Sequence, residues 1–187
     1  MRITPSVLLI ITGALIIASC GIPITAGADY RRNSEFGPYA TFAWEEGNDR
    51  PVGDPRFEDN PFFVERLHEA IERALGERGI RHSESDPAVL VHHHLSVRDR
   101  VEVYEADRER GYETPEYGPG TQVIQYEEGT LLVDIADAET REIVWRGWAR
   151  GDIGPALEDV EEMEERLNEA VSRMFEEFPL DGRRPGS

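Results

Sequence analysis

The spacing of apolar residues predicts an amphipathic helix in the first half of the chain. From Pro61 onward, apolar side chains recur every three or four residues, which places them on one helical face. Asn60 is a suitable N-cap, and Pro61 suits the first turn because its missing N–H would have no partner there. Gly76 or Gly79 is expected to end this helix.

The same spacing returns near the C-terminus and predicts a second, longer helix. Gly154 and Pro155 open it, acidic residues occupy mainly its other face, and Pro179 stops it. Residues 181–187 carry no apolar periodicity, and we expect a disordered tail.

Alternating patterns predict strands between and before these helices. The strand candidates are residues 39–44, 88–104, 131–135 and 143–148, and residues 137–140 make the turn of a hairpin. We expect one α+β domain over residues 29–180, with a mostly antiparallel sheet of about five or six strands and two helices packed on one face.

The first residues have the pattern of a bacterial lipoprotein signal. Arg2 precedes the apolar run Val7–Ala18, which is too short to span a bilayer as a helix. Ile17-Ala18-Ser19-Cys20 then resembles a lipobox, in which the cysteine is lipidated and becomes the new N-terminus. This predicts a signal peptide over residues 1–19 and a lipid anchor with a tether over residues 20–28. The alternative is an ordinary signal-peptidase cut at residues 26–28, which would discard Cys20.

The charge of the chain changes what it can bind. The formal net charge is −18, with 38 acidic residues against 20 basic ones, and removal of Arg2 with the signal makes it 19 − 38 = −19. So acidic a chain should repel nucleic acid. Cys20 is the one cysteine, so no intrachain disulfide can form, and its place at a signal junction does not suit a nucleophile.

Candidate chemistry is sparse. His92 and His94 share one face of the predicted strand and could supply two metal ligands, but a site needs three or four, so we favour a structural role. His68 is interpreted as a surface residue of the first helix. We expect Asp134 to face outward or pair with an arginine such as Arg146, and Asp137 to accept backbone N–H groups of its turn.

Aromatic residues supply the candidates for partner binding. Trp145 and Trp148 fall on opposite faces of one strand, so we expect one to fill the core and the other to lie in a groove or at a partner surface. Tyr112 and Tyr117, in an expected exposed loop over residues 105–120, suggest the same kind of surface.

The segment "YEEGTLLVDIADAETREIVWRGWA" resembles the characteristic segment of bacterial lipoproteins that carry domain of unknown function 4136. The strands "YATFAW" and "DPAVLVHHH" match in order and spacing. The resemblance implies an envelope lipoprotein with an α+β domain and stable anchoring by several acyl chains. It implies no reaction, no catalytic residue and no cofactor.

We therefore expect a non-enzymatic lipoprotein that lies in the outer membrane, faces the periplasm and docks an envelope protein. Gly21 stands where an aspartate would favour retention in the inner membrane. The alternative is a module that binds a small ligand or metal between sheet and helices through His92 and His94.

Overall fold

Two long strands form the centre of the fold. We analysed a computed structural model, which describes residues 23–31, 36–45, 53–105 and 121–179. Within these residues the elements follow in the order β1 (Thr25–Tyr30), β2 (Thr41–Trp44), α1 (Pro55–Glu58), α2 (Pro61–Gly76), β3 (Arg81–His82), β4 (Val89–Glu105), β5 (Thr121–Asp137), β6 (Ile143–Asp152), α3 (Gly154–Glu158) and α4 (Val160–Glu176).

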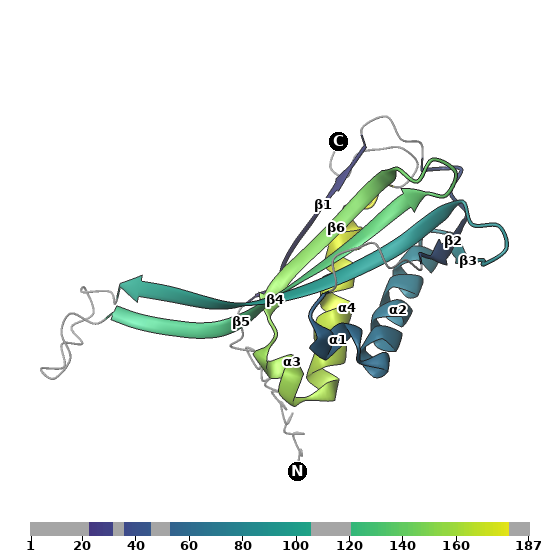
Figure 1. Cartoon of the computed structure of the whole chain (residues 1–187). Coiled ribbons are helices and arrows are strands. Elements are labelled where there is room, and N and C mark those ends of the chain that lie inside the picture. The colour runs from purple at the N-terminus through teal and green to yellow at the C-terminus, as the bar shows by residue number, and fades with distance from the viewer. Residues whose placement is uncertain (1–22, 32–35, 46–52, 106–120, 180–187) are drawn as a thin grey trace, which may run out of the picture.

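The strands form one sheet in the order β1-β6-β5-β4-β2-β3. The pairs β1–β6, β6–β5 and β5–β4 are antiparallel, while β2 runs parallel to both β4 and β3. Helices α2 and α4 cover one face of this sheet (Figure 1), and Arg73 of α2 donates to Asn168 of α4 over 3.0 Å. The predicted fold class, a mostly antiparallel sheet with helices on one face, is confirmed.

The core lies between the sheet and the helices. Alternate residues of the central strands point into it, including Val91 and Leu95 of β4, Val133 and Ile135 of β5, and Trp145 of β6. The apolar stripes of α2 and α4 cover them, as the spacing predicted. The buried residues of the two helices are Phe63, Leu67, Ala70, Ile71, Ala74 and Leu75, and Leu167, Ala170, Val171, Met174 and Phe175.

The structure corrects the expected tether. Residues 25–28 belong to β1, which pairs with β6 from Thr25↔Arg150 to Tyr30↔Trp145, so the fold begins before residue 29. The side chains of Thr25–Ala28 are too small to give the alternating pattern that predicts a strand. Pairing with a distant segment gives them that conformation.

The expected final helix is two helices. The side chain of Asp159 accepts the N–H groups of Glu161 and Glu162, which caps α4 and separates it from α3. Helix α1 lies in a stretch for which no helix was predicted, and Asp54 caps it in the same way.

Strands β4 and β5 also run much further than the rest of the sheet. Strand β5 reaches Thr121 rather than beginning at residue 131, and it pairs with β4 along the whole length of both. Beyond Glu128, β6 no longer accompanies it, so the two strands project as a ribbon (Figure 1). We call residues 97–105 and 121–128 the arm.

Candidate interaction surface

The sheet face away from the helices carries a cluster of polar and aromatic side chains. We call it the open face. The strand registers set side chains of β4, β5, β6 and β1 in rows across it, such as His92–Asp134–Arg146–Asp29 and His94–Leu132–Trp148–Gly27. The charged and aromatic residues used below are His92, His94, Arg98, Arg100, Glu128, Asp134, Arg146, Trp148 and Arg150.

Asp134 and Arg146 form the best-defined ion pair of this face. Arg146 Nε lies 2.6 Å from Asp134 Oδ1, and Nη2 lies 2.7 Å from Oδ2. This two-pronged geometry is the strong form of a carboxylate–guanidinium pair. It raises the pKa of Arg146, because the hydrogen bond to Asp134 favours the charged guanidinium. The expected pairing of these two residues is confirmed.

A second carboxylate lies under two arginines where the sheet becomes the arm. Arg98 Nη2 is 2.6 Å and Arg100 Nε is 3.2 Å from the carboxylate of Glu128. Burial opposes ionisation of Glu128, but the hydrogen bonds from Arg98 and Arg100 outweigh it and lower the pKa of this carboxyl group.

The depth of these groups decides the sign of the charge at the surface. The side chains of Glu128 and Asp134 are each 10% exposed, whereas those of Arg98, Arg100 and Arg146 are 55%, 43% and 49% exposed. The carboxylates therefore lie beneath and the guanidinium groups above. In a chain with a formal charge of −18, the central part of the open face presents guanidinium groups to its surroundings, while exposed Asp29 lies at its β1 end.

Trp148 lies across the sheet between two neighbours. A Cβ atom on Gly27 would lie 2.8 Å from Cζ2 of Trp148, so the indole rests on the backbone of β1. The guanidinium carbon of Arg150 lies 5.0 Å from the ring centroid, within the range of a cation–π interaction. Trp148 is half-buried.

Trp145 is not available to any partner. Its side chain is 0% exposed and packs against Phe175 and Phe178 of the C-terminal region, at ring-centroid distances of 4.8 and 5.4 Å. The expectation that one of the two tryptophans fills the core is confirmed. The partner-binding candidate Trp145 is thereby corrected to a core residue.

The histidines divide between the two faces. His92 and His94 are half-buried on the open face, so they cannot line a space between sheet and helices, as the ligand-binding alternative required. Within the described residues, no group of three or more His, Cys, Asp or Glu side chains could hold a metal ion.

His93 faces the helices and joins an aromatic cluster there. Its ring centroid lies 5.1 Å from that of His68 and 6.2 Å from that of Trp44. His68 stacks on Trp44 with centroids 3.7 Å apart, and burial lowers the pKa of its imidazole. His68 is thus a packed residue, which corrects its interpretation as a surface residue. Trp44 in turn donates to Glu72 over 3.2 Å.

Asp137 has the turn role expected of it. Its Oδ1 accepts the N–H groups of Glu139 and Thr140 at 3.1 and 2.8 Å. The bond from the Thr140 backbone is the main reason that the pKa of Asp137 is lowered.

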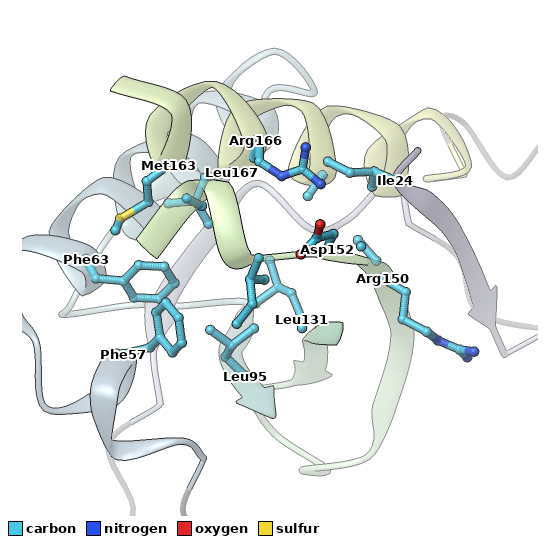
Figure 2. Close-up of a pocket in the computed structure, with 16 residues that line it drawn as sticks. Ile24, Phe57, Phe63, Leu95, Leu131, Arg150, Asp152, Met163, Arg166 and Leu167 are labelled. Atoms are coloured by element: carbon cyan, nitrogen blue, oxygen red, sulfur yellow. The ribbon is translucent and has the colours of Figure 1, made fainter. Parts of the chain in front are cut away.

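Figure 2 shows an apolar hollow between sheet and helices, which lies beside the base of the arm. Phe57 and Phe63 line one side of it, and Ile24 and Leu167 line the other. Its volume is about 70 Å³. Ligand pockets usually measure several hundred Å³, so this hollow is a gap in core packing.

Three candidates lie outside the described residues. They are the lipidation site Cys20 and the loop tyrosines Tyr112 and Tyr117. Within the described part of the chain, no helix is both long enough and apolar enough to cross a membrane.

Arg98, Arg100, Glu128 and Arg150 were not predicted as residues of this surface. Arg98 and Arg100 lie two residues apart, and this spacing was a usable signal because alternate residues of a strand share a face. The sequence does not show which side chains of neighbouring strands lie side by side, because that depends on the registers of β4 with β5 and of β5 with β6.

Comparison with known proteins supports the family resemblance. Residues 27–180 match the family model described as Domain of unknown function (DUF4136). A search of curated proteins gave no match.

Solved structures are similar to this chain at low sequence identity, and the first of them shares the fold. A PDZ domain protein from Parabacteroides distasonis has a TM-score of 0.52 and 12% identity, over 85% of this chain and 37% of that protein, so this chain spans little more than a third of its length. The PelC dodecamer from Paraburkholderia phytofirmans has a TM-score of 0.46 and 10% identity, over 87% of this chain and 100% of that one. A minor lipoprotein from Acinetobacter baumannii has a TM-score of 0.37 and 11% identity, over 74% and 91%. At these identities the likeness concerns the fold alone.

Proposed function

The chain belongs to the DUF4136 family, and we propose that it is a lipoprotein of the bacterial envelope, attached by lipid at Cys20 to the outer membrane and facing the periplasm. The lipobox Ile17–Cys20 after an apolar run supports the anchor. Gly21, in place of an aspartate, supports the outer membrane. Two or more acyl chains would make the attachment stable, because one chain alone binds membranes only marginally.

We propose further that the protein is not an enzyme and that it docks an envelope protein through the open face. The observation that carries this role is the layering of charge: the arginines of the face lie above nearly buried carboxylates, in a chain that is otherwise strongly acidic. Arginine and tryptophan are also the residues most enriched where proteins bind one another.

The same layering indicates the chemistry of the partner. Arg146 and Arg150 are exposed on either side of Trp148, so a protein segment with two or more carboxylates beside an apolar side chain would complement this strip. A basic segment would meet like charge there, although the outer surface of α4 would attract it. Charge therefore selects both the partner and the face on which it binds.

The anchor is tested by the intact mass of the protein extracted in mild detergent from its own envelope. We expect the chain to begin at Cys20 and to carry the mass of acyl chains. The Cys20→Ala variant should lose that mass and leave the membrane fraction. A wild-type chain that begins after Ala28 would refute the anchor.

The docking role is tested by photo-crosslinking in intact cells. A photoreactive amino acid replaces His94 on the open face in one strain and Glu69, exposed on the outer side of α2, in a control strain. We expect one discrete protein adduct from position 94 and none from position 69. The adduct should disappear when Arg150→Glu is added, and the captured protein should carry an acidic segment at the crosslink.

Three results would refute docking through this face. They are no adduct at position 94, equal adducts at both positions, and an adduct that Arg150→Glu leaves unchanged. An adduct of twice the protein's own mass would assign the face to a second copy instead of an acidic partner.

A further inference from the structure

The arm has an edge that the rest of the sheet does not have. The backbone N–H of Glu45 donates to the carbonyl of Val91, and that of Asp54 donates to the carbonyl of Leu95. The backbone N–H and C=O groups of the odd-numbered residues of β4 therefore point away from β5. Beyond Leu95, no strand in the described part of the chain pairs with this side. Residues 97–105 therefore form a free edge of nine residues, about 27 Å long.

The β1 and β3 edges of the sheet are protected, and the unpaired stretch of β5, residues 121–127 beyond the end of β6, is shorter than the β4 edge. On the outer side of β1, the Ala28 N–H donates to Glu177 Oε2 over 3.3 Å, and the Ile24 carbonyl accepts from Arg173 Nη1 over 2.7 Å. At the opposite end, β3 has only two residues. Side-chain caps and short edge strands are ways in which proteins avoid unwanted pairing, and the β4 edge has neither.

Within the described residues the arm is a ribbon of only two strands. An isolated pair of strands is marginally stable in water. At the middle of the free edge, the apolar side chain of Val101 is 58% exposed. A third strand on this edge would supply both hydrogen bonds and cover.

We propose that the occupant is a second copy of the chain, with the two β4 edges paired antiparallel about a two-fold axis at Val101. Val101 is the midpoint of residues 97–105, so this register uses the whole free edge of both copies. It makes about ten backbone hydrogen bonds. It also joins the two arms into one four-stranded sheet with an isologous interface.

The charge pattern of the edge selects this register. Centred on Val101, the pairing places Arg100 opposite Glu102 of the second copy, twice by symmetry, and no like charges face each other. Registers centred on residues 99, 100 or 102 place Asp99, Arg100 or Glu102 opposite its own copy. Like charges directly opposite each other destabilise a strand pair, and opposite charges stabilise it.

The positive charge of Arg100 is only partly balanced within the arm. It shares the carboxylate of Glu128 with Arg98, so two guanidinium groups meet one carboxylate within the arm. Glu102 of the second copy would complete the balance.

The direct test is disulfide formation in the full-length protein within its own envelope. The variant Val101→Cys places two thiols at the symmetry axis, where Cα atoms about 5.5 Å apart allow a disulfide. Gln125→Cys is the matched control, because Gln125 lies directly across the arm from Val101 and is also exposed. In the proposed dimer the two control thiols are about 14 Å apart.

Oxidation should convert Val101→Cys to a species of twice the mass and leave Gln125→Cys and the wild type as single chains. No dimer from Val101→Cys, or equal dimer from both variants, would overturn the proposal. Arg150→Glu on the open face should leave the disulfide yield unchanged, so this test fails or succeeds separately from docking of the acidic partner.

Exchange of charges provides a second readout that needs no cysteine. Arg100→Glu and Glu102→Arg should each weaken the dimer about tenfold in sedimentation experiments in mild detergent, because each change puts two like-charge pairs into the interface. The double variant should restore it to near the wild-type value. A double variant no stronger than either single one would refute this register.

Discussion

The two faces of the sheet hold their tryptophans in opposite ways, although only two residues separate Trp145 from Trp148. Trp145 is enclosed by aromatic rings of the C-terminal region and has no exposed surface. Trp148 rests on a glycine, meets an arginine and keeps part of its surface in solvent. One face is held by apolar packing against helices, and the other by ion pairs and one close backbone contact.

The difference shows which part of the molecule can be specialised for binding. Removal of apolar contacts from the covered face leaves a cavity, whereas the open face can exchange neighbours with solvent or a partner. Stability should therefore depend on the covered face and recognition on the open one.

The largest separation of the two faces should come from truncation of each tryptophan. We expect Trp145→Ala to lower the free energy of unfolding by about 3–5 kcal/mol, since a fully buried aromatic leaves a cavity. Trp148→Ala should lower it by about 1 kcal/mol, since the half-buried ring gives up less apolar area. Urea titrations of both variants measure the difference. Equal losses would mean that the open face contributes to the core as much as the covered one.

A sharper comparison adds one methyl group under each indole. A Cβ atom on Gly147 would overlap the ring of Trp145, which has nowhere to move, so Gly147→Ala should destabilise by about 2–3 kcal/mol. Gly27→Ala presses on Trp148, which can shift into solvent, so we expect about 1 kcal/mol. Gly37→Ala, with no atom within 4 Å of the new Cβ, is the control. Thermal melts that rank Gly27→Ala above Gly147→Ala would reverse the comparison.

The ion pairs of the open face should make it sensitive to acid. The pKa of Glu128 lies below the ordinary value of 4.5, so its ionised form stabilises the fold at neutral pH, and this contribution is lost as the pH falls through the folded-state pKa. Glu128→Gln should destabilise by about 1 kcal/mol at pH 7, and less as the pH drops below 4.5. Unfolding measured from pH 7 to pH 3 tests this. A constant difference would show that the ion pairs contribute nothing.

The smallest effect should come from a titration on the covered face. Burial holds the pKa of His68 below 6.5, so the neutral ring stabilises the fold above that pH, and stability falls as protonation begins below it. His68→Phe keeps a ring against Trp44 and cannot protonate. It should reduce the loss of stability between pH 7 and pH 5 by less than about 1 kcal/mol. An unchanged pH profile would contradict this prediction.

The helices could be predicted because their signals are local. Asn60 and Pro61 mark the start of α2, and the apolar spacing continues to its end. The break between α3 and α4 was also present in the sequence, as an aspartate followed by acidic residues. Continuous apolar spacing from Leu157 through Val160 concealed it, and both of these residues are exposed in the structure.

The sheet was harder to predict, because strands depend on distant partners. Residues 25–28 are small and become a strand only by pairing with β6 and by lying under Trp148. The open face shows the same limit. The two-residue period placed Arg146 and Trp148 on the same face of the sheet, opposite to the face of Trp145. The burial of Asp134 and Glu128 beneath arginines required the register.

The contacts that hold β1 have a consequence for the order of synthesis and folding. The first strand from the N-terminus pairs with β6 and is bound by Arg173 and Glu177, residues almost 150 positions later in the chain. During synthesis and export it therefore has no neighbours until nearly all of the polypeptide has followed. Contacts between residues so far apart in the chain form slowly. Under the lipidation proposed at Cys20, modification of that residue would come before the fold is complete.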